Sequence, residues 1–290
     1  MIAEFAPAKI NLYLHVGPLR RDGLHELRSL FAFVGDGDRI IAQASRDLSL
    51  ELRGPFGAAL AGEDVRRNLV YRAALALRDA AGVRDGAAIV LEKNLPIAAG
   101  VGGGSADAAA ALRALVRLWK LTIAPAELRR LAFSLGADVP ACLDASPVLV
   151  GGAGERIAPG PRMAPLHVAL VNPRVAMPTG PVFRAFDAQN PAPLAPQFDR
   201  LRPATFAGAI EMIGATRNDL EPFAIRRAPV VGEALRFLWA TPGVLGARMS
   251  GSGATVFALF SSAAAARRAA QRAQGRGWWS AAAAMLRGAP

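Results

Sequence analysis

The sequence of 290 residues predicts an α+β fold, because strand patterns and helix patterns are spread along the whole chain. Three observations support this prediction. In residues 10–16 apolar and polar side chains alternate, which is typical of a half-buried strand. The glycine run at residues 100–104 passes directly into an alanine-rich stretch with a high helix propensity. Residues 244–260 contain two apolar runs around a glycine-rich turn, and an alanine-rich helix is expected from Ala263.

The first half of the chain is predicted to alternate between strands and helices. Strand patterns cover residues 10–16, 30–34, 39–42, 48–52 and 87–91. The run Gly-Asp-Gly-Asp at residues 35–38 predicts a turn between two of these strands. Asn68 is a favourable N-cap for a helix that ends at Gly82. Pro125 is well suited to open another helix, which is expected to stop at Gly136.

The second half is predicted to form a separate domain. An apolar and then glycine-rich stretch at residues 148–154 indicates a boundary, so we expect domains over residues 1–154 and 155–290. A strand is expected at residues 166–171. The proline-rich segment 173–203 is predicted to be a loop, and a loop of this length in a compact domain is typically functional or mobile.

The composition excludes several kinds of protein. Apolar runs stay shorter than a membrane span and the N-terminus lacks a signal-peptide pattern, so no membrane partner is expected. The single cysteine, Cys142, cannot form an internal disulfide, which fits a cytoplasmic location. The three histidines are too few and too scattered to predict a zinc site.

The formal net charge of +11 makes nucleic-acid binding an alternative that has to be weighed. The arginines stand in scattered pairs rather than in one basic block, and aromatic residues do not alternate with them as a base-stacking surface requires. We therefore expect no nucleic-acid partner. The excess of positive charge is better explained as a solvated surface that helps to attract polyanionic nucleotides.

The glycine run is the strongest functional signal. Glycines that lead into a helix direct unpaired backbone N–H groups and the positive end of the helix dipole at one point, which is typical of a phosphate site. The run lacks the lysine of a Walker A loop, because Ser105 and Ala106 follow Gly104. The third glycine of a dinucleotide fingerprint is also missing. A flexible linker is disfavoured, because an apolar strand and a strong helix flank the run.

The segment from Pro96 to Ala109 resembles the ATP loop of the GHMP kinases, the superfamily of galactokinase, homoserine kinase and mevalonate kinase. Further segments resemble the same family in the family's order. These segments are residues 7–16, 21–27, 136–140, 218–221 and 248–257. The resemblance implies the GHMP kinase fold, with an N-terminal domain like the second domain of ribosomal protein S5 and a ferredoxin-like C-terminal domain. It also implies that residues 1–154 form the ATP-binding and catalytic domain and that residues 155–290 form the substrate side.

The resemblance implies ATP with Mg²⁺ as the cofactor. The positions that match the family's ATP site are Asn68, Pro96, Ile97, Ala98, Ala99, Gly100, Val101, Gly102, Gly103, Gly104, Ser105 and Ala106. Ser105 is a natural N-cap, and its hydroxyl is alternatively a contact for phosphate or Mg²⁺. Asp107 is either a helix acid favoured by the dipole or a residue linked to the metal, and the metal ligands stay open. The family commonly has serine at the position of Ala106, so one hydroxyl contact is absent from this chain.

A second glycine-rich turn is expected near the phosphates by resemblance, with a tight hairpin as the alternative. It consists of Ser250, Gly251, Ser252 and Gly253. The resemblance assigns catalysis to Lys9 and Asp138. A carboxylate accepts the proton of an alcohol while an ammonium group stabilises the alkoxide. The alternatives are an exposed strand lysine and an Asx-turn residue before Pro140. Because only three of the 34 basic residues are lysines, a lysine inside a motif indicates a task for a compact ammonium.

On the substrate side, four positions match the family: Asn11, His25, Thr179 and Phe183. The family members with these motifs phosphorylate the 2-hydroxyl of a small-molecule cytidine diphosphate sugar alcohol, in the formation of isoprenoid precursors. His25 would contact the cytosine edge, and Phe183 would stack on the ring or else belong to the core. Leu24 replaces the usual aromatic residue before this histidine. The alternatives are a homoserine or mevalonate type of kinase and a basic S5-like nucleic-acid-binding protein. The sequence does not predict the oligomeric state.

Overall fold

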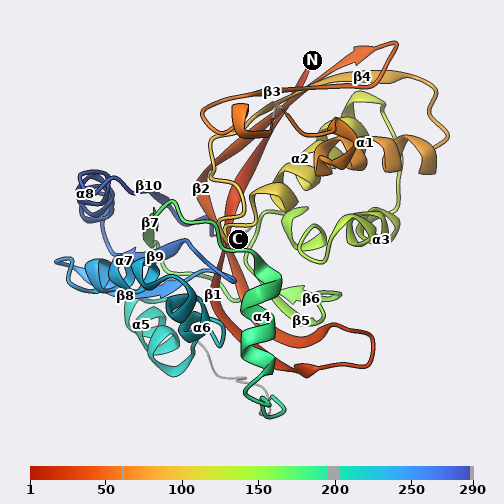
Figure 1. Ribbon diagram of the computed structural model, residues 1–290. Helices are drawn as coiled ribbons and strands as arrows, with labels where there is room; N and C mark the ends of the chain where they lie inside the picture. Colours follow the sequence, from red (N-terminus) through yellow and green to blue (C-terminus); the bar gives the residue numbers. More distant parts are fainter. Residues whose placement is uncertain (61, 195–202, 288–290) are drawn as a thin grey trace. The chain divides into compact units, whose positions relative to one another are not determined.

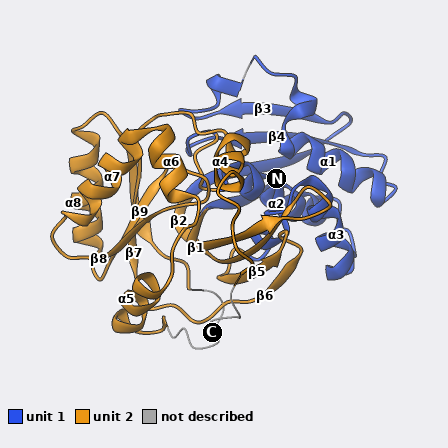
Figure 2. Ribbon diagram, turned by 60° about the horizontal axis from the view of Figure 1, so that its bottom comes forward, with its two compact units in different colours: residues 1–8, 37–97, 102–144 blue, residues 9–36, 98–101, 145–290 orange. Residues whose placement is uncertain are grey.

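The computed structural model describes residues 1–60, 62–194 and 203–287 (Figure 1). The chain divides into two compact units, each built from separate stretches of sequence (Figure 2). Unit 1 consists of residues 1–8, 37–97 and 102–144, and unit 2 of residues 9–36, 98–101 and 145–290. The long strands β1 (Ile2–Leu19) and β2 (His25–Ser45) contribute to both units. The predicted domains, 1–154 and 155–290, stay a prediction.

Unit 1 combines a strand layer with helices. Strand β4 (Gly86–Glu92) pairs parallel to β3 (Ser49–Arg53) and antiparallel to residues 39–45 of β2. The helices are α1 (Leu69–Ala80), α2 (Gly103–Leu118) and α3 (Pro125–Leu135), with short 3₁₀ helices η1 (Ala58–Leu60), η2 (Val65–Arg67) and η3 (Pro140–Cys142). Most buried residues of α2 are alanines, whose small side chains let α1 pack closely against it.

Local helix signals in unit 1 are confirmed. The side-chain oxygen of Asn68 accepts a hydrogen bond of 2.9 Å from the backbone N–H of Val70, so Asn68 is the N-cap of α1. Helix α3 begins with Pro125 and has Gly136 as its C-cap. These ends follow from residues that lie within one turn of the helix end, which is why the sequence predicts them.

Unit 2 contains an antiparallel sheet in the order β10 (Trp279–Ala284), β7 (His167–Asn172), β9 (Val256–Phe260) and β8 (Val244–Met249). Its helices are α4 (Thr179–Asp187), α5 (Phe206–Ala215), α6 (Glu221–Arg227), α7 (Pro229–Trp239) and α8 (Ala263–Gln274). Strands β5 (Val148–Gly152) and β6 (Arg156–Pro159) form a hairpin, and β5 pairs with residues 27–31 of β2.

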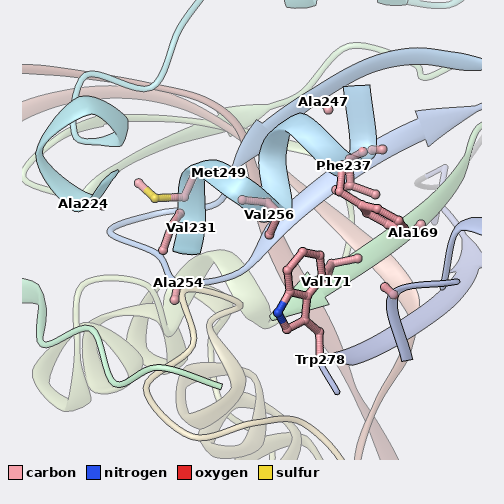
Figure 3. Close-up of a cluster of buried hydrophobic side chains, with 14 of the residues drawn as sticks. Ala169, Val171, Ala224, Val231, Phe237, Ala247, Met249, Ala254, Val256 and Trp278 are labelled. Atoms are coloured by element: carbon pink, nitrogen blue, oxygen red, sulfur yellow. The ribbon is translucent and has the colours of Figure 1, made fainter. Parts of the chain in front are cut away.

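The core of unit 2 lies between this sheet and its helices (Figure 3). Val171 of β7 and Val256 of β9 meet the side chains of α7 in this cluster. Phe237 of α7 and Trp278 pack edge to face, with ring centroids 5.6 Å apart. The predicted strands of residues 244–260 and the helix from Ala263 are confirmed. No helix in the described residues is both long enough and apolar enough to cross a membrane.

The predicted turn at residues 35–38 is wrong, because β2 runs through these residues without a break. A Cβ atom at Gly37 would overlap the backbone of Ala6, so this glycine allows two chain segments to approach each other. Asp38 is buried, and its carboxylate accepts hydrogen bonds from the backbone N–H groups of Asn94 at 2.5 Å and Leu95 at 2.8 Å. Gly37 and Asp38 therefore make contacts with residues distant in the sequence and do not form a turn.

The segment 173–203 is not a loop throughout, because it contains the helix α4. Pro181 lies in the first turn of α4, where a missing N–H group costs nothing. Val182 and Phe186 are buried one turn apart, so the helix presents an apolar face. Residues 195–202 of the segment lie outside the described residues.

Candidate active site

The glycine run opens helix α2. The N-cap is Gly102, with a φ of 61°, and the helix begins at Gly103. The prediction that Ser105 is the N-cap is therefore wrong. Glycine adopts positive φ at little cost, so the helix starts three residues earlier than the first capping side chain would suggest. The cap has no side-chain hydrogen bond, so the first backbone N–H groups of α2 are available to a ligand.

Three ionisable side chains are buried beside this helix start. The ammonium group of Lys93 contacts the carboxylates of Asp38 and Asp107, at 2.6 Å from Asp107 Oδ2. Relative exposures are 3% for Lys93, 0% for Asp38 and 2% for Asp107. A Cβ atom on Gly103 would lie 2.9 Å from Lys93 Nζ, so the cluster reaches the first residue of α2. Asp107 thus contacts Lys93. The sequence predicts instead either a helix acid favoured by the dipole or a residue linked to the metal.

The cluster shares one cation between two carboxylates. Burial raises the pKa of Asp107 to about 8; Lys93 opposes this shift and Asp38 adds to it. Burial acts against the Lys93 ammonium, but Asp107 and Asp38 more than offset it and its pKa is raised. Asp107 therefore keeps its proton to a higher pH than an ordinary aspartate does. One oxygen of Asp107, Oδ1, has no hydrogen-bond partner among the described residues.

In unit 2 a polar network joins β1 to the turn between β8 and β9. The Lys9 ammonium donates to Asn11 Oδ1 at 3.1 Å and lies 4.1 Å from the centroid of the Phe31 ring. The Asn11 amide donates to Ser29 Oγ at 2.9 Å, and its backbone N–H donates to Ser250 Oγ at 3.1 Å. Lys9 is 4% exposed and Asn11 is 3% exposed. Lys9 is therefore not an exposed strand lysine.

The turn at residues 250–253 contacts the glycine run. Ser250 Oγ donates to the carbonyl oxygen of Gly100 at 2.7 Å. A Cβ atom on Gly100, whose φ is 76°, would overlap the Ser250 carbonyl oxygen. The amide of Asn218 donates to the carbonyl oxygens of Met249 at 2.9 Å and Gly251 at 2.7 Å, which fixes the turn from the other side. The turn is a tight hairpin, and it also lies against the predicted ATP loop.

The hydroxyl groups of Thr179 and Ser252 are 3.0 Å apart, so the start of α4 reaches the same turn. Further along α4, the ring of Phe183 lies 4.8 Å from the His25 ring. His25 Nε2 is 2.7 Å from Asp187 Oδ1. Unit 2 therefore brings predicted substrate residues together in two places, with Asn11 and Thr179 at the turn and Phe183 at His25.

Three other predicted residues differ in their exposure to solvent. Asp138 is half-buried in unit 1, in the turn after α3. Leu24 is 48% exposed in the turn between β1 and β2, where its backbone N–H donates to Asp22. Ile97 is 40% exposed.

A cavity of about 570 Å³ lies in unit 2 beside the Asn11 network. Tyr13, His15, Arg28 and Ser29 line it together with the hairpin of β5 and β6. His15 Nε2 accepts a hydrogen bond from the backbone N–H of Arg217 at 3.3 Å, and burial lowers the pKa of His15. Ser29 is shared by the cavity and by the contact with Asn11.

The described residues contain no group of three or more histidine, cysteine, aspartate or glutamate side chains placed to hold a metal ion. Mg²⁺ in kinases is commonly bound through one or two carboxylates together with substrate phosphates and water. Asp107 faces Lys93, so it is not a ready ligand. The Ser105 hydroxyl lies in the first turn of α2, among the residues predicted to hold the phosphates.

Several residues of the site carry no clear sequence signal. Ser29, Asp38 and Asp187 were not predicted, because each acts through a partner distant in the sequence. Lys93 had one usable signal, since it is one of three lysines in an arginine-rich chain.

A glycine-rich helix start and a buried lysine held by polar groups are features typical of phosphoryl transfer, the reaction of small-molecule kinases. The models of the GHMP kinases N terminal domain and the GHMP kinases C terminal domain match residues 68–152 and 194–277. The chain belongs to the GHMP kinase family, whose phosphate donor is ATP. The predicted α+β fold of this family is thereby confirmed.

Among relatives, the 4-diphosphocytidyl-2-C-methyl-D-erythritol kinase of Hyphomonas neptunium is 48% identical over 97% of this chain and 95% of its own length. That of Rhizorhabdus wittichii is 51% identical over 90% and 86%. A solved 4-(cytidine 5'-diphospho)-2C-methyl-D-erythritol kinase has a TM-score of 0.79 at 35% identity, covering 99% of this chain and 100% of that chain. Homoserine kinase from Cytophaga hutchinsonii has a TM-score of 0.73 at 20% identity, covering 99% and 95%, and shares the fold alone.

Proposed function

We propose that the chain transfers the γ-phosphoryl group of ATP to the 2-hydroxyl of 4-diphosphocytidyl-2-C-methyl-D-erythritol. The products are the 2-phosphate and ADP, and the reaction belongs to the non-mevalonate formation of isoprenoid precursors. The observation that carries this proposal is the identity of 48% with a kinase of that name over nearly the full length of both chains. Cytoplasmic location, and the lack of a nucleic-acid or membrane partner, are part of the same proposal.

The glycine run and the start of α2 are proposed to hold the triphosphate. Backbone N–H groups at a helix start bind phosphate without a charged side chain. Mg²⁺, when bound with the nucleotide, neutralises phosphate charge. The Ser105 hydroxyl, in the first turn of α2, is the protein group proposed to meet the phosphates or the ion. Its neighbour Ala106 is buried and apolar, so it adds no further hydroxyl.

Lys9 and Asp138 are proposed to act at the hydroxyl that is phosphorylated. Asp138 would accept the proton of the hydroxyl, and the ammonium of Lys9 would stabilise the alkoxide. What supports the role of Lys9 is its fixed position, because Asn11 accepts from the ammonium group and Ser29 holds the Asn11 amide. An ammonium group that is already oriented loses little conformational entropy when the substrate binds.

His25 and Phe183 are proposed to hold the cytosine base, and Asn11 and Thr179 the erythritol end. Phe183 packs at the edge of the hydrophobic core while its ring stays close to His25. The ring pair thus offers an aromatic face beside a polar edge, which suits a flat polar base. The exposed Leu24 offers an aliphatic contact in place of an aromatic one.

An assay with Mg²⁺ and ATP tests the reaction against the alternatives. ADP formation is expected with the cytidine substrate, whereas homoserine and mevalonate are expected to give none. Lys9→Ala and Asp138→Asn should each lower kcat by about 10²–10⁴-fold with little change in the KM for ATP, because both act at the acceptor hydroxyl.

Two matched variants control for the substitutions themselves. Lys120→Ala removes an exposed lysine, and Asp79→Asn neutralises an exposed aspartate at the end of α1. Both should keep the turnover of the unmodified enzyme. Normal turnover in Lys9→Ala or Asp138→Asn would remove that residue from the mechanism. ADP formation with homoserine or mevalonate, and none with the cytidine substrate, would refute the proposed acceptor.

A further inference from the structure

His25 is held by a carboxylate that the proposed reaction does not use. Asp187 is the last residue of α4, and its Oδ1 lies 2.7 Å from His25 Nε2. The side chains are 9% and 28% exposed, so the contact is largely shielded from water. A carboxylate only accepts hydrogen bonds, so Nε2 carries the proton. Among the described residues, none bonds to the other ring nitrogen, Nδ1, which is an acceptor in the neutral ring.

The orientation of the His25 ring is fixed by the same helix. The Phe183 ring lies 4.8 Å away at an interplanar angle of 42°, and the Phe186 ring lies 6.3 Å away at 68°. Phe186 is buried and packs edge to face on Phe223, with ring centroids 5.6 Å apart. Helix α4 therefore contacts the histidine through two rings and one carboxylate.

We propose that Asp187 is a positioning residue that makes the acceptor site prefer cytosine to uracil. By holding the proton on Nε2, it leaves Nδ1 of His25 as a hydrogen-bond acceptor. The exocyclic amino group of cytosine is a donor and matches this nitrogen, whereas uracil, like thymine, carries an acceptor oxygen at that position. Two facing acceptors leave a polar group unsatisfied, which disfavours uracil. This inference rests on the proposed function, because it takes the base to lie at His25.

The first test compares the cytidine substrate with the same molecule carrying uracil. The unmodified enzyme should favour cytidine in kcat/KM by about tenfold or more, the scale of one unsatisfied hydrogen bond. In Asp187→Asn the amide either donates or accepts, so the ratio should fall by about tenfold. The change should appear in the KM for the base-carrying substrate, with kcat and the KM for ATP preserved. Asp187→Glu keeps a carboxylate and should retain most of the preference.

The second test reads the tautomer without substrate. The chain has only three histidines, so ¹⁵N-labelled histidine gives few signals, and His25→Gln assigns those of His25. At about pH 8, Nε2 should carry the proton and Nδ1 should not. Asp187→Asn should give a mixture of both forms. Asp79→Asn, which makes the same substitution at an exposed site, should change neither the tautomer nor the substrate ratio.

The outcomes separate this inference from the proposed function. A proton on Nδ1 in the unmodified enzyme, or an unchanged base preference in Asp187→Asn, would overturn the inference. Turnover of the cytidine substrate would still support the proposed function. A preference for uracil would overturn it as well. If the enzyme turns over neither substrate, the proposed function fails, and the base preference fails with it.

Discussion

The ionisation of one residue, Asp107, makes the stability of the folded protein depend on pH. It sits fully buried in α2 beside Lys93, and its pKa is raised to about 8, chiefly by burial. In the unfolded chain its pKa returns to the ordinary value near 3.8. Between these two values the folded protein holds a proton that the unfolded chain has released. The stabilising contribution is therefore complete at acid pH and is lost as the pH rises towards about 8.

Asp107→Asn should remove this pH dependence. The amide has the shape of a protonated carboxyl group, so the variant and the unmodified protein should have similar free energies of unfolding near pH 4. With rising pH the variant should become relatively more stable, by at most about 1.4 kcal/mol per pH unit. Urea unfolding at about pH 5.5 and 8.5 measures the difference, because an ordinary acid would already be ionised at both values. A difference that does not vary with pH would show that Asp107 is ionised throughout.

Asp38→Asn provides the contrast within the same cluster. Asp38 pairs with Lys93 and also accepts two backbone N–H groups, from Asn94 and Leu95. The substitution removes one of the two carboxylates beside the buried Lys93 ammonium, and loss of one partner of a buried ion pair typically costs about 3–5 kcal/mol. This variant should be destabilised at both pH values. It serves as the control in which the substituted aspartate is an ion-pair partner of Lys93.

At the scale of elements, the glycine run depends on close backbone contact with the turn between β8 and β9. Gly100 has a φ of 76°, and a Cβ atom there would overlap the carbonyl oxygen of Ser250 and lie 2.8 Å from that of Gly253. Both obstacles are backbone atoms, which cannot rotate away as a side chain does. The Ser250 hydroxyl adds a hydrogen bond of 2.7 Å to the carbonyl oxygen of Gly100. A change in the backbone at Gly100 would therefore also displace the turn between β8 and β9.

Gly100→Ala should therefore raise the KM for ATP and lower the melting temperature. The left-handed backbone alone costs about 1–2 kcal/mol with a side chain, and the overlap with Ser250 adds to it. Gly214→Ala is the matched control, since Gly214 lies in α5 and an added Cβ atom would have no other atom of the described residues within 4 Å, apart from its chain neighbours and the backbone of its own helix. There the same substitution should stabilise the helix by up to about 1 kcal/mol. An unchanged KM for ATP in Gly100→Ala would show that the loop geometry does not control nucleotide binding.

Elements with local signals could be predicted from the sequence, and elements that depend on distant contacts could not. The cap at Asn68 needs only the next two residues, so it was predictable. The unbroken strand at residues 35–38 depends on Asn94, 56 residues from Asp38, and so the local glycines and aspartates wrongly predicted a turn. In the candidate site, Lys9 lies within a recognisable motif and was therefore predicted. Asp187 contacts His25, which is 162 residues away in the sequence, and no local pattern indicates that contact.

At the scale of the whole molecule, the arginines behind the net charge of +11 are spread along the sequence rather than gathered in one block. The arginine pairs at 66–67, 129–130, 226–227 and 267–268 are all exposed, and they lie on η2, α3, α6 and α8. A nucleic-acid surface would place such pairs along one element or one face, with aromatic rings among them. Arginines on four separate elements instead give a diffuse positive field that attracts any polyanion.

Retention on nucleic acid should therefore depend on charge alone. We expect weak binding to duplex DNA or RNA at low salt, with an affinity that falls linearly with salt on logarithmic axes and a Kd weaker than about 10⁻⁶ M near physiological salt. Heparin, a polyanion without bases, is the control and should be released over the same salt range. Under these conditions nucleic acid should not alter kinase turnover. A defined nucleic acid that stays bound at nanomolar Kd in physiological salt, while heparin is released, would instead show a base-reading surface, because charge neutralisation alone cannot distinguish the two polymers.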